Sequence, residues 1–313
     1  EDETVSSSCS KCHGGQEGFR FYLQYGGGTT PEPDNGLECG TCHTSYSDTA
    51  DPADAWAVVE VDDVTFPNGE VVEGVDNESN ICMTCHSGRE SQASVDGRIA
   101  SGRFGFRNIH YLPAGATVYG GEINVGYQFL VPAMYSGRWT GHPGGESCVD
   151  CHNPVATDHS FHPDDNPGCT GSCHASSPSV SDIRLMASHV GVDFDGDGDS
   201  AEPLGGEIEG LEEGLLAAIQ GYATVPICYN SHAYPYWFED TDDSGGECDD
   251  GESTRYGDWD AELMRTTFNY QFSKKDPGAW AHNFDYMAQI LIDAIDHVGG
   301  DITGYVRPAP PAP

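Results

Sequence analysis

Basic residues are scarce in this sequence. Its 313 residues include 13 Lys and Arg against 51 Asp and Glu, which leaves a formal net charge of −38 at pH 7. Proteins that bind nucleic acid need clustered cations to replace the counterions of the phosphates, and anionic lipid head groups repel a chain this acidic. The charge balance therefore excludes nucleic acids and anionic membrane surfaces as partners.

Apolar residues are also few, because only 37% of the residues are hydrophobic while the chain has 40 Gly and 19 Pro. The longest uncharged run, residues 214–238, is interrupted by Pro226, Pro235 and His232, so it predicts no membrane span. The opening residues, EDETVSSS, contain no basic, apolar leader and predict a mature protein whose signal peptide has been removed. Since the side chains supply little apolar material for a core, we expect a bound group to fill part of it.

Ten of the 12 cysteines, in contrast, come in close pairs. Four pairs have two cysteines three residues apart and a His directly after the second: Cys9, Cys12 and His13; Cys39, Cys42 and His43; Cys82, Cys85 and His86; Cys148, Cys151 and His152. This C-x-x-C-H pattern is typical of c-type haem attachment, because the thiols bind the two vinyl groups of one porphyrin while the imidazole binds its iron. Zinc sites also use paired cysteines, but a His after every second cysteine has no role in them. The pattern therefore predicts four covalently attached haems.

A fifth pair, Cys169 and Cys173 followed by His174, has one more residue between its thiols. The adjacent His predicts a fifth haem, and a local disulfide or a zinc site is the alternative. Cys228 and Cys248 have no neighbouring His and predict a disulfide, which would constrain the unfolded chain by about 3 kcal/mol. Haem attachment and a disulfide both predict a location outside the reducing cytosol.

Eight further histidines lie outside these five motifs. The candidates for the second axial ligand of each iron, ranked by their sequence context, are His110, His142, His159, His162, His189 and His282. Of His159 and His162, which stand three residues apart, we expect only one to bind iron. His232 and His297 have other roles available, in aromatic packing and at a helix C-terminus. If every iron has two imidazoles, no position is open for a substrate, so this count favours electron transfer over catalysis.

The cysteine pattern also predicts the organisation of the chain. Residues 1–190 hold all ten paired cysteines and few periodic segments, so we expect a haem-binding region that is mostly coil with porphyrins as its core. Residues 191–306 are acidic, and apolar spacing there predicts helices over 211–222, 259–274 and 280–298 that pack back on the haems. Residues 307–313 form an extended Pro-rich tail. The predicted fold is thus mostly coil with a few α-helices, little β-structure and a helical C-terminal part.

Two groups of charged residues stand out. Asp193, Asp195, Asp197 and Asp199 occupy every second position in DFDGDGDSAE, with glycines on both sides of Asp197, a spacing that gathers carboxylates around one calcium ion. The twelfth position of this loop is Leu204 and not Glu, so Glu202 or Glu207 would have to complete the site, and a solvated acidic turn is the alternative. Five of the 13 basic residues lie between residues 88 and 140, where haem propionates or solvent are their expected partners; they are Arg89, Arg98, Arg103, Arg107 and Arg138.

With its five attachment motifs, the sequence resembles multihaem c-type cytochromes over residues 9–174. Three segments, FRNIHYLPAGATVYGGE, DFDGDGDSAEPLGGEIEGL and NYQFSKKDPGAWAHNFDY, resemble segments of extracellular multihaem cytochromes of respiring microbes, including relatives of those that polymerise into nanowires. The resemblance implies stacked bis-His haems with His110, His142, His189 and His282 as distal ligands. In filament-forming relatives an iron can take one imidazole from the next subunit, so it also implies a possible homo-polymer.

The predicted function is electron transfer through five c-type haems, without enzymatic activity, on the outside of the cell. Its partners would be further copies of the chain or other redox proteins that donate and accept electrons. One alternative is a multihaem oxidoreductase with an open-site haem that acts on a small nitrogen or sulfur compound. Another is a soluble periplasmic electron shuttle.

Overall fold

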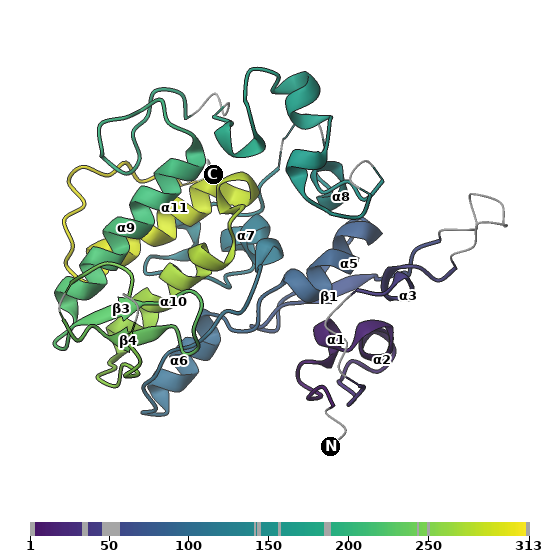
Figure 1. The fold of residues 1–313 in the computed structure, drawn as a ribbon, viewed down its shortest axis with the longest axis horizontal. Helices are drawn as coiled ribbons and strands as arrows, with labels where there is room; N and C mark the ends of the chain where they lie inside the picture. Colours follow the sequence, from purple (N-terminus) through teal and green to yellow (C-terminus); the bar gives the residue numbers. More distant parts are fainter. Residues whose placement is uncertain are drawn as a thin grey trace. The chain divides into compact units, whose positions relative to one another are not determined.

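The computed structural model describes residues 4–32, 37–45, 57–140, 142, 145–155, 158–184, 189–242, 244–248 and 251–310. The chain divides into two compact units, shown as a ribbon in Figure 1. Unit 1 comprises Glu1–Thr65, Val71–His86 and Gly144–Cys151. Unit 2 comprises Phe66–Glu70, Ser87–Pro143 and His152–Pro313. The sequence predicted a boundary near residue 190, between a haem-binding region and an acidic helical region. That boundary stays a prediction.

Unit 1 is built from short helices and one hairpin. Its elements are α1 (Ser10–His13), α2 (Gly15–Tyr25), α3 (Cys39–Cys42), β1 (Asp63–Thr65), β2 (Val71–Glu73), α5 (Asn77–His86) and α8 (Cys148–Cys151). The two strands pair antiparallel, with Val64 opposite Val72. A small apolar core joins Phe19 of α2, Ile81 of α5 and Val59 and Val61 of the segment before β1. Helix α5 contacts both α1 and α8, so it occupies the middle of this unit.

Unit 2 contains the longer helices. Its elements are α6 (Gln92–Ala100), α7 (Ala114–Tyr119), α9 (Leu204–Tyr222), β3 (Ile227–Tyr229), β4 (Trp237–Glu239), α10 (Ala261–Lys275) and α11 (Ala279–His297), with short turns η1 (Gly120–Glu122), η2 (Pro132–Met134), η3 (Pro163–Asp165), η4 (Cys169–Cys173) and η5 (Val180–Asp182). Helix α11 packs against α9, α10 and α7, and Figure 1 shows α9, α10 and α11 grouped together. The core lies between these helices, where Leu211, Phe268 and Leu291 are fully buried.

The C-terminal helices confirm the prediction from apolar spacing. Helix α9 begins earlier than expected, at Leu204, because Leu204 and Ile208 continue the buried face and Pro203 precedes the first turn. Helix α10 begins after Asp260, whose carboxylate accepts a hydrogen bond from the amide of Leu263 at 2.8 Å.

The N-terminal half has more regular structure than the sequence predicted. Helices α2, α5 and α6 lie in the region that was expected to be mostly coil. In α2, Phe19 and Leu23 are four residues apart and face one apolar core, and Gly26 ends the helix in a left-handed conformation with φ of 67°. The expectation of coil and helix with little β-structure is confirmed, because helix and coil dominate the described residues and the strands are few and short.

A disulfide joins two segments of unit 2, and polar contacts hold its C-terminal segment. Cys228 on β3 and Cys248 form the predicted disulfide, with their Cα atoms 4.9 Å apart. The start of the Pro-rich segment lies against α11, because Arg307 Nε donates to Asp293 at 2.7 Å and Gln289 Nε2 donates to the carbonyl of Pro308 at 3.3 Å.

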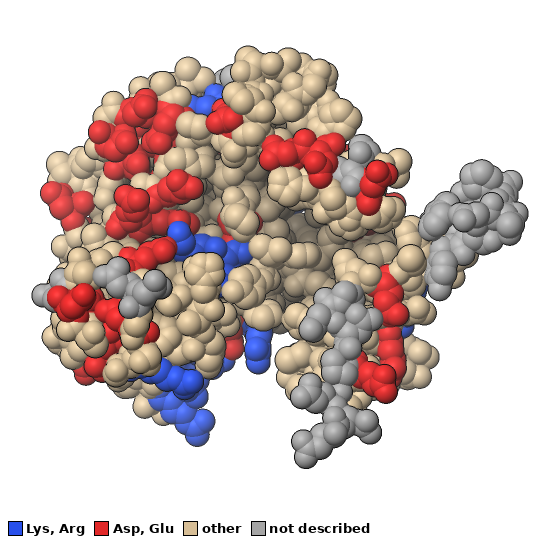
Figure 2. Space-filling model, viewed as in Figure 1, with Lys and Arg blue, Asp and Glu red and all other residues tan. Residues whose placement is uncertain are grey.

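Figure 2 shows acidic side chains spread over one face, with the Lys and Arg side chains in a few small groups. Among the described helices, each is too short or too polar to cross a bilayer.

Candidate haem attachment sites

The four C-x-x-C-H motifs form helical turns. The first and second lie on α1 and α3, the third on the last turn of α5, and the fourth on α8. Residues three apart on a helix share one face, so each turn directs its two thiols to the same side, as attachment to a single porphyrin requires. All ten motif cysteines are unbridged and at least partly exposed. These residues therefore fit covalently attached haem.

The fifth motif has a wider turn that takes up its additional residue. Residues Cys169–Cys173 form the π-helical turn η4, in which the amide of His174 donates to the carbonyl of Cys169 at 3.0 Å. A π turn bonds residues five apart, where an α turn bonds residues four apart. Two cysteines four residues apart in a π turn therefore face nearly the same side, as cysteines three apart do in an α turn. This geometry supports the predicted fifth haem, and Cys169 and Cys173 are not bridged.

Thiols of different motifs meet in unit 1. Cys85 of the third motif contacts the thiol of Cys12 in the first, and its Sγ lies 3.8 Å from the carbonyl oxygen of Lys11. Cys82, at the other end of the third motif, contacts the thiol of Cys148 in the fourth. The hydrogen bond with the neighbouring thiol, and then burial, raise the pKa of both Cys82 and Cys85. Three attachment motifs are thus close neighbours around α5.

The histidine of the fourth motif faces a histidine that is distant in sequence. The ring centroids of His152 and His282 are 6.2 Å apart, and their planes are inclined by 39°. A metal–imidazole bond of about 2 Å, together with the radius of each ring, places the centroids of two imidazoles on opposite sides of one metal about 6 Å apart. The spacing of this pair therefore fits two imidazoles that would bind one metal ion between them.

Both rings of this pair have a hydrogen-bond partner at Nδ1. Nδ1 of His152 lies 2.6 Å from the carbonyl oxygen of Phe161, and Nδ1 of His282 lies 2.8 Å from Oδ1 of Asp276. Donation from Nδ1 to these acceptors makes Nε2 the nitrogen with the lone pair, as in a metal ligand. Burial alone would raise the pKa of Asp276, but its interactions with His282, together with hydrogen bonds from Thr117 and the amide of Gly278, lower that pKa. Asp276 is therefore a carboxylate that orients His282.

A second pair involves the fifth motif. The ring centroids of His142 and His174 are also 6.2 Å apart, with their planes inclined by 28°. Nδ1 of His174 is buried and has no hydrogen-bond partner among the described residues. The structure thus brings two predicted distal ligands, His142 and His282, next to motif histidines. Their role as ligands stays a prediction.

The other predicted distal ligands have different neighbours. His189 is buried, its Nε2 lies 2.7 Å from Oδ1 of Asp285, and its ring packs against Phe194 and Phe284. The ring of His110 lies against Tyr111, and that of His159 against Phe161. His159 and His162 are both exposed, and the side chain of His162 is 63% exposed. Iron binding by these four residues stays a prediction.

Two curated proteins are similar to this chain over most of its length. It is 28% identical to the C-type polyheme cytochrome OmcB of Geobacter sulfurreducens in an alignment of 253 positions that covers 70% of this chain and 31% of that protein. It is 29% identical to the C-type polyheme cytochrome OmcC of the same organism in an alignment of 294 positions that covers 84% of this chain and 36% of that protein. The chain is a relative of polyhaem c-type cytochromes. It spans about a third of the length of these relatives. No family model and no solved structure matches it.

The predicted calcium loop of this cytochrome relative is a compact group of acids. Carboxylate oxygens of Asp193, Asp195 and Asp197 lie within 4.8 Å of one another, and Asp195 forms a second such group with Glu202 and Glu207. Both glutamates named from the sequence are therefore near the loop. Asp199 belongs to neither group, and its carboxylate accepts a hydrogen bond from the amide of Ala201 at 3.0 Å.

The electrostatics of this loop favour a bound cation. Burial, and then the neighbouring carboxylates, raise the pKa of Glu202 to about 7. Burial is also the largest cause that raises the pKa of Asp195 to about 6. One guanidinium already compensates part of the negative charge, because Arg184 Nη1 lies 2.5 Å from Oε1 of the fully buried Glu207. Calcium binding here stays a prediction.

Sequence reasoning missed the groups that orient the ligands. Asp276 marked only the end of a helix, and no pattern in the sequence indicates that the carbonyl of Phe161 accepts from His152. Asp276 precedes Pro277 and lies six residues before His282, and its amide donates to the carbonyl of Ser273 at 2.9 Å in the turn between α10 and α11. The sequence did contain one signal for Asp276, namely an acid in a turn shortly before a candidate ligand.

Proposed function

We propose that this chain transfers electrons through five covalently attached c-type haems whose irons are each bound by two histidines. The observation that carries the proposal is the pair formed by His152 and His282, at 6.2 Å between centroids and with both Nδ1 atoms hydrogen-bonded. The names of the relatives, both polyheme cytochromes, support it. When bound, such haems supply one-electron chemistry between ferric and ferrous iron.

The residues of the chain make these centres electron carriers by closing them to substrates. Two imidazoles on one iron leave no coordination position for a reacting molecule. The anionic Asp276, hydrogen-bonded to His282, makes that imidazole a stronger donor and favours the more highly charged metal. The carbonyl of Phe161 holds the opposite ring, so both ligands keep their positions when the charge on the metal changes.

The attachment points also lie close enough together for electrons to pass between them. Helix α5, with the third motif, contacts α1 and α8, which carry the first and fourth motifs. The thiol contacts between Cys12 and Cys85 and between Cys82 and Cys148 place these motifs side by side. This clustering supports a chain of neighbouring redox centres over three isolated ones.

We further propose an exported protein that acts outside the reducing cytosol, as a polymer or with other redox proteins. Thioether attachment and the disulfide between Cys228 and Cys248 support an oxidising compartment. Because the chain carries a net charge of −38, copies of it repel one another unless salt or cations screen them. A filament should therefore require ionic strength or calcium. Electron micrographs that show only monomers under these conditions, with every haem six-coordinate, contradict it.

The absorption and electron paramagnetic resonance spectra of the purified holoprotein test the central proposal. We expect only low-spin haem, no rapid binding of carbon monoxide by the reduced protein, and an intact mass with five haems. A high-spin component that binds carbon monoxide rapidly would instead support the alternative of a multihaem oxidoreductase with an open site. A mass with four haems would overturn attachment at Cys169 and Cys173.

A further inference from the structure

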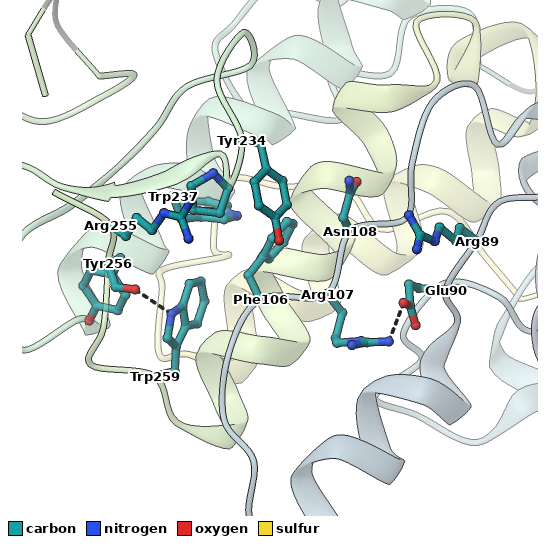
Figure 3. A pocket seen from close by; sticks show the side chains of 11 residues that line it. Arg89, Glu90, Phe106, Arg107, Asn108, Tyr234, Trp237, Arg255, Tyr256 and Trp259 are labelled. Carbon is teal, nitrogen blue, oxygen red and sulfur yellow. Dashed lines mark hydrogen bonds and ion pairs between the residues drawn. The ribbon is translucent and has the colours of Figure 1, made fainter. Parts of the chain in front are cut away.

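Unit 2 contains a cavity of about 320 Å³ that combines basic and aromatic side chains. Figure 3 shows Arg255, Trp237 and Trp259 on one side of it and Arg89 and Arg107 on the other. The first side comes from the segments around β4, and the second from the segments next to α6. The cavity is therefore assembled from parts of the chain that are more than a hundred residues apart.

Backbone hydrogen bonds and aromatic packing fix the walls of this cavity. The amide of Arg89 donates to the carbonyl of Ile109 at 2.9 Å, and the amide of Tyr256 donates to the carbonyl of Trp237 at 3.1 Å. The ring of Phe106 stacks on Trp259, with 6.1 Å between centroids and an inclination of 27°. The site is thus formed before any ligand arrives, which lowers the entropic cost of binding.

The charge of the lining is opposite to that of the whole chain. Arg89, Arg107 and Arg255 line the cavity, and Glu90, which pairs with Arg107, is the one acidic residue among the lining residues. The complete chain has only 13 basic residues and a net charge of −38. Three arginines at one cavity of so acidic a protein favour an anionic ligand, because guanidinium groups bind carboxylate, sulfonate and phosphate through charge-assisted hydrogen bonds.

Buried donor atoms in the same lining add a second indication. The indole nitrogen of Trp237 and Nε of Arg107 are buried and have no hydrogen-bond partner among the described residues. Buried donors are seldom left unpaired in folded proteins, so acceptor atoms of a ligand would supply the partners that they lack.

We propose that this cavity binds a planar aromatic molecule that carries an anionic group. The aromatic side chains would stack on its ring, and the arginines on the two sides of the cavity would attract the anionic group. The volume is sufficient for a bicyclic ring with a substituent, and it is at the lower end of ordinary ligand pockets. The proposal does not depend on the haem assignment.

Isothermal titration of the haem-loaded chain with naphthalene-2-sulfonate tests this site. The probe is redox-inactive, so the result is independent of electron transfer. We expect one molecule bound per chain. Naphthalene-2-sulfonamide, which has nearly the same shape without the charge, and cyclohexanesulfonate, which has the charge without the planar ring, should each bind about tenfold more weakly or worse.

Variants with matched charge changes locate the binding. Arg255→Gln should weaken binding about tenfold, whereas Arg103→Gln, at an exposed arginine outside the lining, should leave it unchanged. Glu90→Gln should strengthen binding several-fold, because it releases Arg107 from its ion pair and removes the one acidic side chain of the lining. A gain of affinity does not arise from misfolding, so this variant keeps the test decisive.

Three outcomes would overturn the proposal. One is the absence of saturable binding to the haem-loaded chain, as expected if propionates of an attached haem fill the cavity. Another is equal weakening by Arg255→Gln and Arg103→Gln, which indicates general electrostatic attraction. The third is unchanged or weaker binding to Glu90→Gln.

Discussion

Replacing Asp276 by Asn should raise the reduction potential of one haem. The carboxylate of Asp276 lies 2.8 Å from Nδ1 of His282, and its side chain is only 1% exposed, so solvent screens its charge little. An atom bonded in this way to an iron-bound imidazole lies roughly 6 to 7 Å from the metal. At an effective dielectric constant of 20, one unit charge at that distance is worth about 2.5 kcal/mol. Since the charge favours ferric iron, its loss corresponds to an increase of about 100 mV for a one-electron couple.

A spectropotentiometric titration of the holoprotein measures this change. We expect one component of the multihaem titration to move upward by about 100 mV while the others keep their potentials and all haems stay low-spin. Asp296→Asn is a matched control, because Asp296 is an exposed acid on the same helix, α11, and its replacement changes the net charge equally. Titration curves for Asp276→Asn that superimpose on those of the wild type, or that shift as little as those of Asp296→Asn, would refute the assignment of His282 as an oriented ligand.

Three further predictions concern ligation, the disulfide and calcium. His282→Ala should convert one haem to a high-spin form that binds carbon monoxide, whereas His297→Ala should not, and identical spectra for the two variants would remove His282 from the ligand set. Cys228→Ser should lower the free energy of unfolding by about 3 kcal/mol, measured by denaturation of the oxidised holoprotein, and an unchanged midpoint contradicts the constraint on the unfolded chain. A calcium chelator should lower the melting temperature of the wild type and of Asp199→Asn but not that of Asp195→Asn, because only Asp195 belongs to both acidic groups; insensitivity of the wild type to the chelator counts against a calcium site.

The parts of the molecule that depend on local spacing were predictable from the sequence. The attachment motifs need only residues three apart, and the long C-terminal helices show apolar residues such as Leu211 and Leu215 on one face. The disulfide followed from two cysteines without motif partners. Each of these features arises from residues within about twenty positions of one another.

The parts that depend on tertiary packing were not predictable. His152 and His282 are 130 positions apart, and no local pattern states that they face each other. The buried position of His189, with its Nε2 2.7 Å from Oδ1 of Asp285, was likewise not indicated by any local pattern. The basic cavity could not be predicted from the sequence either, because Arg89 and Arg255 line one cavity only after the segments around β4 pack beside those next to α6.

The wider turn at Cys169–Cys173 bears on how attachment sites are counted in genomes. What two thiols need in order to reach one porphyrin is a common direction, and a π turn provides it for cysteines four residues apart. If the fifth motif carries a haem as proposed, a search that accepts a single fixed spacing misses such a site. Searches for haem-attachment motifs should therefore also include two cysteines four residues apart when a histidine directly follows the second.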